Sequence, residues 1–389
     1  MHNHRTSENY LLSSYNYHLP PELIAQEPAH PRDSSRLMVC DPTSGNSGDS
    51  AVDHRTFREL DTILSSGDVL VINDSRVIPA RVKGLKSTGG KSEVLFLNPL
   101  DDDSPLEALI RGRVREGTVI DPIGSRHPDQ RIKIRRHISE GRYEVMVNGT
   151  TDMSTFLHEV GELPVPPYIK KPLLEQENYQ TVYSGEPGSV AAPTAGLHFT
   201  NDLLHRLERR GVQVMKVTLH VSIGTFLPVR DNDIRNHTME PEYFMLGNSI
   251  KDAIEADSKM IAVGTTVVKT LESAYQVIEG NSSNSWGGSG PGGGGETASV
   301  PKSSRPRGCS PLRTEGWSDL FIYPGHRFFS PLKGMITNFH LPSSTLIMLI
   351  SAYAGRDRIL GFYEQAVKER YRFYSFGDAM FLNGPPVPP

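Results

Sequence analysis

The sequence is poor in cysteine and has no long hydrophobic run. Cys40 and Cys309 are the two cysteines in 389 residues, and neither belongs to a Cys-x-x-Cys pair. This excludes a disulfide framework and is typical of a reduced, cytoplasmic setting. The run "TLIMLISAYAG" is too short to span a membrane, and "MHNHRTSENYLLSSYNYHLP" lacks the apolar core of a signal peptide. We therefore expect a cytoplasmic protein that makes no membrane contact.

Several common catalytic signatures are also missing. There is no G-x-S-x-G elbow, no G-x-x-x-x-G-K-[ST] loop, and no G-x-G-x-x-G after a strand. Hydrolase, P-loop and dinucleotide-binding functions therefore have no support from motifs. His237 and Glu240 have the spacing of metal ligands on a helix, but Pro241 interrupts a helix there. We predict no metal site.

Length and pattern predict two domains. Residues 1–16 are polar, so we expect a disordered extension. Strand-like and helix-like pieces alternate from about residue 151 onward, which predicts an α/β domain. We expect this domain to contain residues 17–67 and 151–389. Residues 68–150 contain short alternating runs such as "SEVLFL" and "YEVMVNG", which predict a separate small β-sandwich or β-barrel. Residues 279–311 are rich in Gly and Ser, and we expect a disordered insertion.

In the α/β part, we expect strands over residues 212–221, 261–264, 319–325 and 334–339. The segment "TTVVKTLESAYQVI" has a helical pattern directly after the strand 261–264. A further helix begins after Ser343 or Ser344 as N-cap and ends at Gly355.

Polar residues follow several of these strands. "IAVG" leads into Thr265 and Thr266, "MITNF" leads into His340, and the turn "APTAGLHFT" precedes a helix of its own. In open α/β sheets, ligands bind beyond the carboxyl ends of strands, where helix N-termini offer free N–H groups. These residues are therefore either helix caps or the walls of one shared crevice. His220 lies on the polar face of its strand, near the end, and is either structural or a base.

Basic residues recur on strand faces of the predicted barrel. Arg131, Lys133 and Arg135 share one face opposite Ile132 and Ile134. The formal net charge of −4 excludes a strongly basic protein but leaves room for such a patch. The face either contacts phosphates or is an ordinary solvated surface. The segment "KERYRFYSFGDAMFL" also mixes cations with aromatic rings, which either stack on bases or form core.

The chain resembles one family over residues 17–382. The similar segments include "YHLPPELIAQEPAHPRDSSRLMV", "GDVLVINDSRVIPARVKG", "PTAGLHF", "VTLHVSIGTFLPV", "IAVGTTVVKTLES" and "TNFHLPSSTL". They are similar, in order, to the S-adenosylmethionine:tRNA ribosyltransferase-isomerases of queuosine biosynthesis. The blocks "PTAGLHF" and "TNFHLPSSTL" are the most specific of them.

The resemblance implies a reaction on tRNA. Enzymes of this family move the ribosyl group of S-adenosylmethionine onto 7-aminomethyl-7-deazaguanine at wobble position 34. The products are epoxyqueuosine-tRNA, adenine and methionine. The resemblance also implies an α/β domain with an inserted small antiparallel β-barrel at about residues 68–150, and no metal or prosthetic group. We expect a monomer. S-adenosylmethionine is then a substrate, and tRNA with a queuosine-type anticodon is the partner.

The resemblance also suggests site residues, by position. The ring candidates for proton transfer are His198, His220 and His340. Candidates for substrate binding are Pro193, Thr194, Gly196, Gly224, Thr225, His237, Glu240, Thr265, Thr266, Asn338, Ser343 and Thr345. Candidates for tRNA binding are Arg76, Arg81, Lys83, Arg131, Lys133 and Arg135. The base and the acid are not assigned individually.

Some positions depart from the family pattern. Ser222-Ile223 stands where the family usually has Gly-Ala, Lys269 replaces an arginine, and His326 replaces a tyrosine. Lysine does not reproduce the bidentate fork of arginine, so a substrate carboxylate held there would bind more weakly. Two other functions remain as alternatives: a different S-adenosylmethionine enzyme such as an RNA methyltransferase, and a non-catalytic tRNA-binding module.

Overall fold

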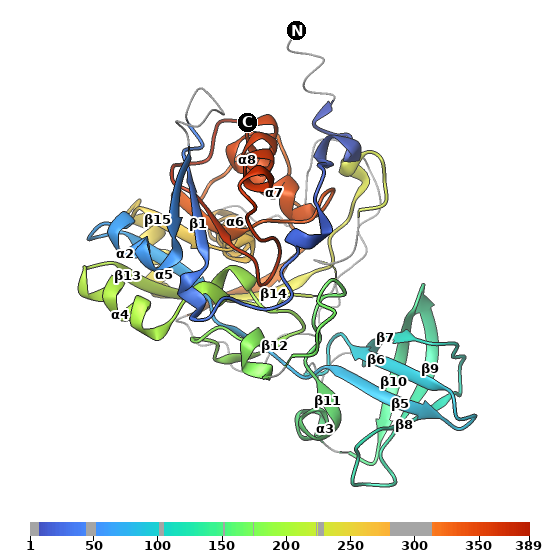
Figure 1. Ribbon diagram of the computed structural model, residues 1–389. Coiled ribbons are helices and arrows are strands. Elements are labelled where there is room, and N and C mark those ends of the chain that lie inside the picture. The colour runs from blue at the N-terminus through green and yellow to red at the C-terminus, as the bar shows by residue number, and fades with distance from the viewer. Residues whose placement is uncertain are drawn as a thin grey trace. The chain divides into compact units, whose positions relative to one another are not determined.

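The structure is a computed structural model that describes residues 8–43, 52–100, 105–150, 152–173, 175–222, 224, 229–280 and 313–389 (Figure 1). The chain divides into two compact units. The first contains Met1–Val77, Val165–Tyr275 and Leu312–Pro389, and the second contains Ile78–Pro164 and Gln276–Pro311. The first unit is the expected α/β domain, and the second contains the expected antiparallel β-barrel.

A mixed nine-stranded sheet forms the centre of the first unit, in the order β16-β14-β13-β3-β15-β17-β18-β1-β2. Four neighbouring strands, β13, β3, β15 and β17, run parallel. All residues of β3, β15 and β18 are buried, so both faces of the sheet are covered. The strands are β1 (Arg36–Cys40), β2 (Val52–Thr56), β3 (Val69–Asn73), β13 (Gln213–Leu219), β14 (Glu242–Gly247), β15 (Met260–Val263), β16 (Arg313–Ser318), β17 (Leu332–Asn338) and β18 (Ala379–Leu382).

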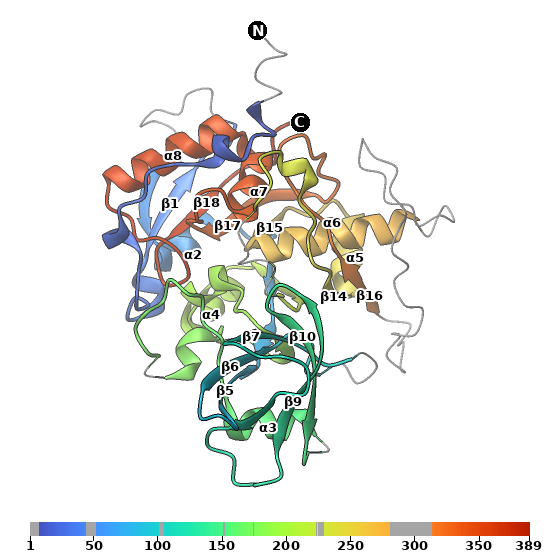
Figure 2. The same cartoon turned by 90° about the vertical axis from the view of Figure 1, so that its right-hand side faces the viewer.

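Helices cover this sheet. Leu203 and Leu207 of α4 and Leu60 of α2 pack with Leu70 and Ile72 of β3 in one buried cluster. Helices α7 and α8 lie side by side in both views of the ribbon (Figures 1 and 2). The helices are α2 (Leu60–Ile63), α4 (Asn201–Arg209), α5 (Asn248–Glu255), α6 (Thr265–Gly280), α7 (Thr345–Ala354) and α8 (Arg356–Lys368).

Short 3-10 helices and one small sheet complete the first unit. Strand β4 (Ser75–Val77) pairs in parallel with β12 (Glu186–Ser189). The 3-10 helices are η1 (Leu12–Tyr15), η2 (Pro21–Leu23), η3 (Arg32–Ser34), η5 (Phe57–Glu59), η6 (Gln176–Tyr179), η7 (Thr194–His198) and η9 (Ile234–Asn236).

The second unit is a closed six-stranded antiparallel barrel. Its strands follow the order β5-β6-β7-β10-β9-β8, and pairing of β8 with β5 closes it. Gly84 allows this closure, because a Cβ there would lie 2.4 Å from Cγ2 of Ile120 on β8. The strands are β5 (Arg81–Lys86), β6 (Lys91–Phe96), β7 (Glu107–Arg111), β8 (Val119–Pro122), β9 (Arg131–Ser139) and β10 (Arg142–Asn148), followed by α3 (Met153–Val160) and β11 (Gly161–Glu162).

Several boundaries differ from those expected. Strand β3 pairs with β13 and β15, so residues 69–73 belong to the large sheet, and the barrel unit begins at Ile78 rather than 68. The apolar run "DVLVIN" predicts a buried strand, but it does not indicate whether that strand pairs within the barrel or within the large sheet. Residues 8–16 are ordered: Tyr15 is fully buried and the Leu12 N–H donates to the Asn232 carbonyl.

Two further expectations concern the end of the glycine-rich segment. The strand expected over 319–325 is instead β16, at residues 313–318, because the residues that pair with β14 are those before Asp319. The expected disordered insertion lies largely outside the described residues, which resume at Arg313; α6 extends to Gly280.

Candidate functional site

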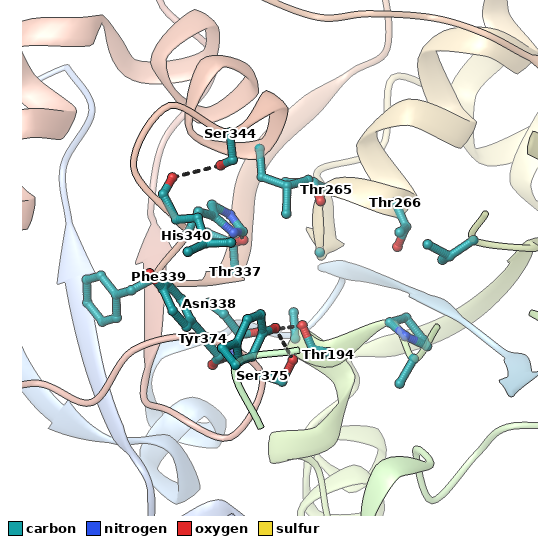
Figure 3. Close-up of a pocket in the computed structure, with 18 residues that line it drawn as sticks. Thr194, Thr265, Thr266, Thr337, Asn338, Phe339, His340, Ser344, Tyr374 and Ser375 are labelled. Carbon is teal, nitrogen blue, oxygen red and sulfur yellow. Dashed lines mark hydrogen bonds between the residues drawn. The ribbon is translucent and has the colours of Figure 1, made fainter. Parts of the chain in front are cut away.

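A pocket lies in the first unit, beyond the carboxyl ends of the parallel strands β15 and β17 (Figure 3). It joins segments that are far apart in the sequence: η7, the start of α6, the end of β17 and the chain before β18. Its polar lining is Tyr168, Thr194, Thr265, Thr266, Thr337, Asn338, His340, Ser344, Tyr374 and Ser375, and its apolar lining is Ala192, Pro193, Ala195, Val221, Gly264, Phe339, Leu341 and Leu346. Among these described residues there is no Asp, Glu, Lys or Arg side chain.

Two helix N-termini border this pocket. Gly264, Thr265 and Thr266 lie where α6 begins, and Ser344 caps α7 by accepting from the Ile347 N–H. The first N–H groups of a helix lack intrahelical partners and carry the positive end of the helix dipole. Oγ1 of Thr266 is buried and has no hydrogen-bond partner within the described part of the chain. The pocket therefore offers donors to a negatively charged group without any charged side chain.

Asn338 lies at the centre of a hydrogen-bond network in the pocket wall. Its Oδ1 accepts from Thr194 Oγ1 at 3.2 Å, and its Nδ2 donates to the Tyr374 carbonyl at 3.2 Å (Figure 3). Nδ2 also lies 3.0 Å from Nε2 of His198. Because both amide hydrogens are used, the orientation of this side chain is fixed.

His198 lies behind Asn338 and does not line the pocket. Its Nδ1 is 2.8 Å from Ser35 Oγ, and its ring stacks on Phe57 with centroids 5.0 Å apart. Since Nε2 accepts from Asn338, we assign the ring proton to Nδ1. Burial, together with Arg372 and Arg32, lowers the pKa of His198 to about 3. The ring is thus neutral, with both nitrogens occupied, and it holds Asn338.

His340 is the histidine that lines the pocket (Figure 3). Its Nε2 lies 2.8 Å from Thr337 Oγ1, and its backbone N–H donates to the Tyr363 hydroxyl at 2.8 Å. Among the residues that the structure describes, Nδ1 of His340 has no hydrogen-bond partner. Burial lowers the pKa of His340 to about 3, so the ring is neutral near pH 7 and can accept a hydrogen bond.

His220, the third ring candidate, does not line this pocket. It follows β13, where its Nδ1 lies 2.7 Å from Ser75 Oγ and its ring stacks on Tyr243. Burial lowers its pKa to about 4. A hydrogen bond and a stacking partner are features of a packed, structural histidine.

Aromatic rings form another part of the pocket wall. Tyr168 and Tyr374 have ring centroids 4.7 Å apart, and the Tyr168 hydroxyl is 2.7 Å from Ser375 Oγ. Tyr374 has φ = +71°, a conformation that costs free energy in a residue other than glycine. Such strain is often found where a side chain must be presented to a ligand.

The remaining predicted substrate-binding residues lie elsewhere. Gly196 packs against Tyr183, Gly224 lies beside the Glu240 side chain, and the His237 ring packs on Phe321. Ser343 and Thr345 flank the N-cap Ser344 but do not line the pocket. Thr225 lies outside the described residues. No group of His, Cys, Asp and Glu in the described ranges has the geometry of a metal site.

Lys269 holds a carboxylate of the protein itself. Its Nζ lies 2.9 Å from Oε2 of Glu242, and both side chains are almost fully buried. Oε1 of Glu242 accepts from the Ser222 N–H. The positive charge at position 269 therefore links α6 to β14 through Glu242.

Four of the six predicted tRNA-binding cations form ion pairs. Arg76 pairs with Glu177, Arg81 with Glu93, Lys83 with Glu162 and Arg131 with Asp121. In the described part of the chain, Lys133 and Arg135 have no carboxylate partner. Ile132 and Ile134 are fully buried, so the alternation expected for β9 is confirmed.

Sequence reasoning missed part of the pocket. Tyr374 and Ser375 belong to "YRFYSFGDAMFL", where Tyr371, Phe373 and Phe376 are buried core. The core interpretation of that segment is thus correct for most of its rings. Tyr168 follows a proline-rich stretch that carries no secondary-structure signal, and nothing in the sequence indicated its place in the pocket.

The chain matches known proteins along nearly its whole length. The family model for queuosine biosynthesis protein matches residues 12–382. S-adenosylmethionine:tRNA ribosyltransferase-isomerase from Heliobacterium modesticaldum is 42% identical over 390 residues, covering 95% of this chain and 98% of the relative. The protein of that name from Symbiobacterium thermophilum is 43% identical over 389 residues, covering 95% and 99%.

A solved structure is also similar. The crystal structure of S-adenosylmethionine tRNA ribosyltransferase from Thermotoga maritima is 31% identical, with 95% of this chain and 99% of that chain covered and a TM-score of 0.48. Since the family model covers almost the whole chain and relatives exceed 40% identity, the protein belongs to the queuosine biosynthesis family.

Proposed function

We propose that this protein is an S-adenosylmethionine:tRNA ribosyltransferase-isomerase. It transfers and isomerises the ribosyl group of S-adenosylmethionine onto 7-aminomethyl-7-deazaguanine at position 34 of a tRNA with a queuosine-type anticodon. Adenine and methionine leave. The observation that carries this proposal, beside family membership, is that the two most specific sequence blocks meet in one uncharged pocket. Since the substrate is tRNA, we place the reaction in the cytoplasm and propose that a monomer suffices.

The uncharged pocket suits S-adenosylmethionine. The N-termini of α6 and α7 offer donors to the methionine carboxylate. The rings of Tyr168 and Tyr374 can face the sulfonium, because cations are attracted to aromatic faces.

Within the described residues, no helix is long and apolar enough to cross a bilayer.

The reaction begins at C5′ of the sugar. The sulfonium makes this proton acidic, so a neutral base beside it could remove it. His340 is our candidate, since it lines the pocket and its Nδ1 has no hydrogen-bond partner among the described residues. Loss of adenine then requires an acid or hydrogen-bond donor, which protonates the leaving base. The aminomethyl nitrogen attacks the ribosyl fragment and gives up a proton, and methionine departs when the epoxide forms.

The other predicted residues take supporting roles in this proposal. Thr194, Thr265, Thr266 and Asn338 bind substrate, with Pro193 shaping the turn. His198 is a positioning residue that acts through Asn338. His220, Gly196, Gly224, His237, Glu240, Ser343 and Thr345 lie outside the pocket lining, and this proposal gives them no contact with the substrate.

One experiment tests the proposed function. The protein is incubated with labelled S-adenosylmethionine and tRNA that carries the aminomethyl-deazaguanine base, and the small-molecule products are identified. We expect adenine and methionine. S-adenosylhomocysteine would instead indicate a methyltransferase, and tRNA binding without turnover would indicate a non-catalytic binding module.

A further inference from the structure

A groove with charged walls runs along one end of the barrel. It lies between the turn that follows β5 and the segment that joins β7 to β8, and its volume is about 680 Å³. Four cationic side chains line it, Lys86, Arg113, Arg115 and Arg131, against two carboxylates, Glu116 and Asp121. The groove therefore has an excess of positive charge, although the whole chain has a net charge of −4.

Two of these cations, the guanidinium groups of Arg113 and Arg115, have no ion-pair or hydrogen-bond partner among the described residues. Arg131 forms an ion pair with Asp121 at 3.1 Å, and Lys86 Nζ donates to the Arg113 carbonyl at 3.0 Å. Arg113 and Arg115 are exposed, and neither has a carboxylate partner in the part of the chain that is described. A ligand can bind these two guanidinium groups without breaking an existing ion pair.

Backbone hydrogen bonds hold the segment that carries them. The Thr118 N–H donates to the Arg115 carbonyl at 2.9 Å, which closes a turn. The Gly117 N–H donates to the Ile134 carbonyl, and the Ile134 N–H donates to the Thr118 carbonyl, both at 2.9 Å. These bonds fix the turn on β9, so the backbone at Arg115 is ordered before any ligand arrives.

The lining chemistry identifies the ligand class. Ser87, Thr88 and Thr118 add hydroxyl donors beside the cations, and the described lining contains no aromatic ring on which a base could stack. Cations and hydroxyls without rings are typical of contacts to phosphate oxygens rather than to bases. We propose that this groove, through Arg113 and Arg115, binds the sugar–phosphate backbone of the tRNA substrate. This inference rests on the proposed function.

The test compares two double variants of the full-length protein with equal changes in charge. Arg113→Gln/Arg115→Gln removes the groove cations, whereas Arg126→Gln/Arg136→Gln removes two exposed cations of the same unit outside the groove. The affinity for the tRNA is measured against salt concentration. For the groove variant, we expect about tenfold weaker binding at low salt and a log–log salt slope reduced by about 1.5, since each lost phosphate contact lowers it by somewhat less than one.

Further readouts separate this proposal from the proposed function. The groove variant should bind S-adenosylmethionine as the unaltered protein does, and should keep its kcat at saturating tRNA while KM for tRNA rises. If the unaltered protein turns over tRNA but the two double variants have equal salt slopes, the groove assignment is wrong. If the unaltered protein neither binds nor modifies tRNA, the proposed function fails.

Discussion

The pocket of the α/β unit and the groove of the barrel unit use opposite chemistry. The pocket is lined by hydroxyls, an amide, an imidazole and aromatic rings, whereas six charged side chains line the groove. A charge withdrawn from water is costly unless it is paired, so a buried site recognises its ligand with neutral groups and helix N-termini. An open surface avoids that cost and can offer cations to a polyanion.

The same contrast applies to the ion pairs of the two units. Lys269 and Glu242 are 8% and 3% exposed, whereas Arg136 and Glu144 of the barrel are 69% and 25% exposed. Breaking a buried pair leaves an uncompensated charge in a medium that solvates it poorly. Breaking an exposed pair leaves a charge that water solvates.

The largest expected effect comes from breaking the buried pair. Lys269→Met should lower the free energy of unfolding by about 3–5 kcal/mol, because Glu242 remains buried and charged. Arg136→Gln should lower it by about 0.5 kcal/mol or less. Urea unfolding of both variants measures the difference. Lys269→Arg keeps the charge and serves as the control. Equal losses of unfolding free energy in Lys269→Met and Arg136→Gln would contradict the expected difference between the buried and the exposed ion pair.

The next effect concerns the two histidines of the pocket region. His340→Ala should lower kcat/KM by about 10²–10³-fold, as expected for a general base. His198→Gln should lower it by about tenfold or less, because an amide can still hold Asn338 and Ser35, whereas His198→Phe loses both contacts. The pH profile of kcat should be unchanged in His198→Gln. Alanine at both positions with full activity would contradict the site assignment.

A smaller effect tests the packing behind the pocket. A Cβ on Gly196 would lie 2.1 Å from the Tyr183 hydroxyl and 2.8 Å from Thr181 Cγ2. Gly196→Ala should therefore cost about 1–3 kcal/mol of stability by overpacking. Gly185→Ala is the matched control, since a Cβ there meets nothing within 4 Å. Adding Tyr183→Phe to Gly196→Ala should recover part of the lost stability, because it removes the hydroxyl that the new Cβ meets. Equal melting temperatures of Gly196→Ala and Gly185→Ala would contradict the expected overpacking.

The last expected effect is a pH dependence of stability. The pKa of His198 is lowered to about 3, below its unfolded value near 6.5, so the unfolded state binds the proton first as the pH falls. Stability is thus full above about pH 6.5 and is lost toward pH 3. Between pH 6 and 4.5, the unfolding free energy of His198→Gln should fall less steeply than that of the unaltered protein, by about 1.4 kcal/mol per pH unit. Parallel curves would show that His198 does not contribute.

The sequence determined the elements that show a clear periodicity and clear end signals along the chain. The alternation in β9 predicted its buried and exposed faces, and the N-cap at Ser343 or Ser344 and the end at Gly355 delimited α7. The motif blocks identified the family and six of the pocket residues: Pro193, Thr194, Thr265, Thr266, Asn338 and His340. These features depend on neighbours along the chain, so local chemistry specifies them.

Tertiary structure decided which polar groups already have partners. His198 and His340 lie in similar sequence contexts. In the structure, Ser35 and Asn338 occupy both ring nitrogens of His198, whereas His340 lines the pocket. Likewise, Asp121 pairs with Arg131, while Arg113 and Arg115 have no carboxylate partner in the described ranges. Hydrogen bonds and ion pairs form between residues distant in the chain, and their geometry exists only after the sheet and the barrel have closed.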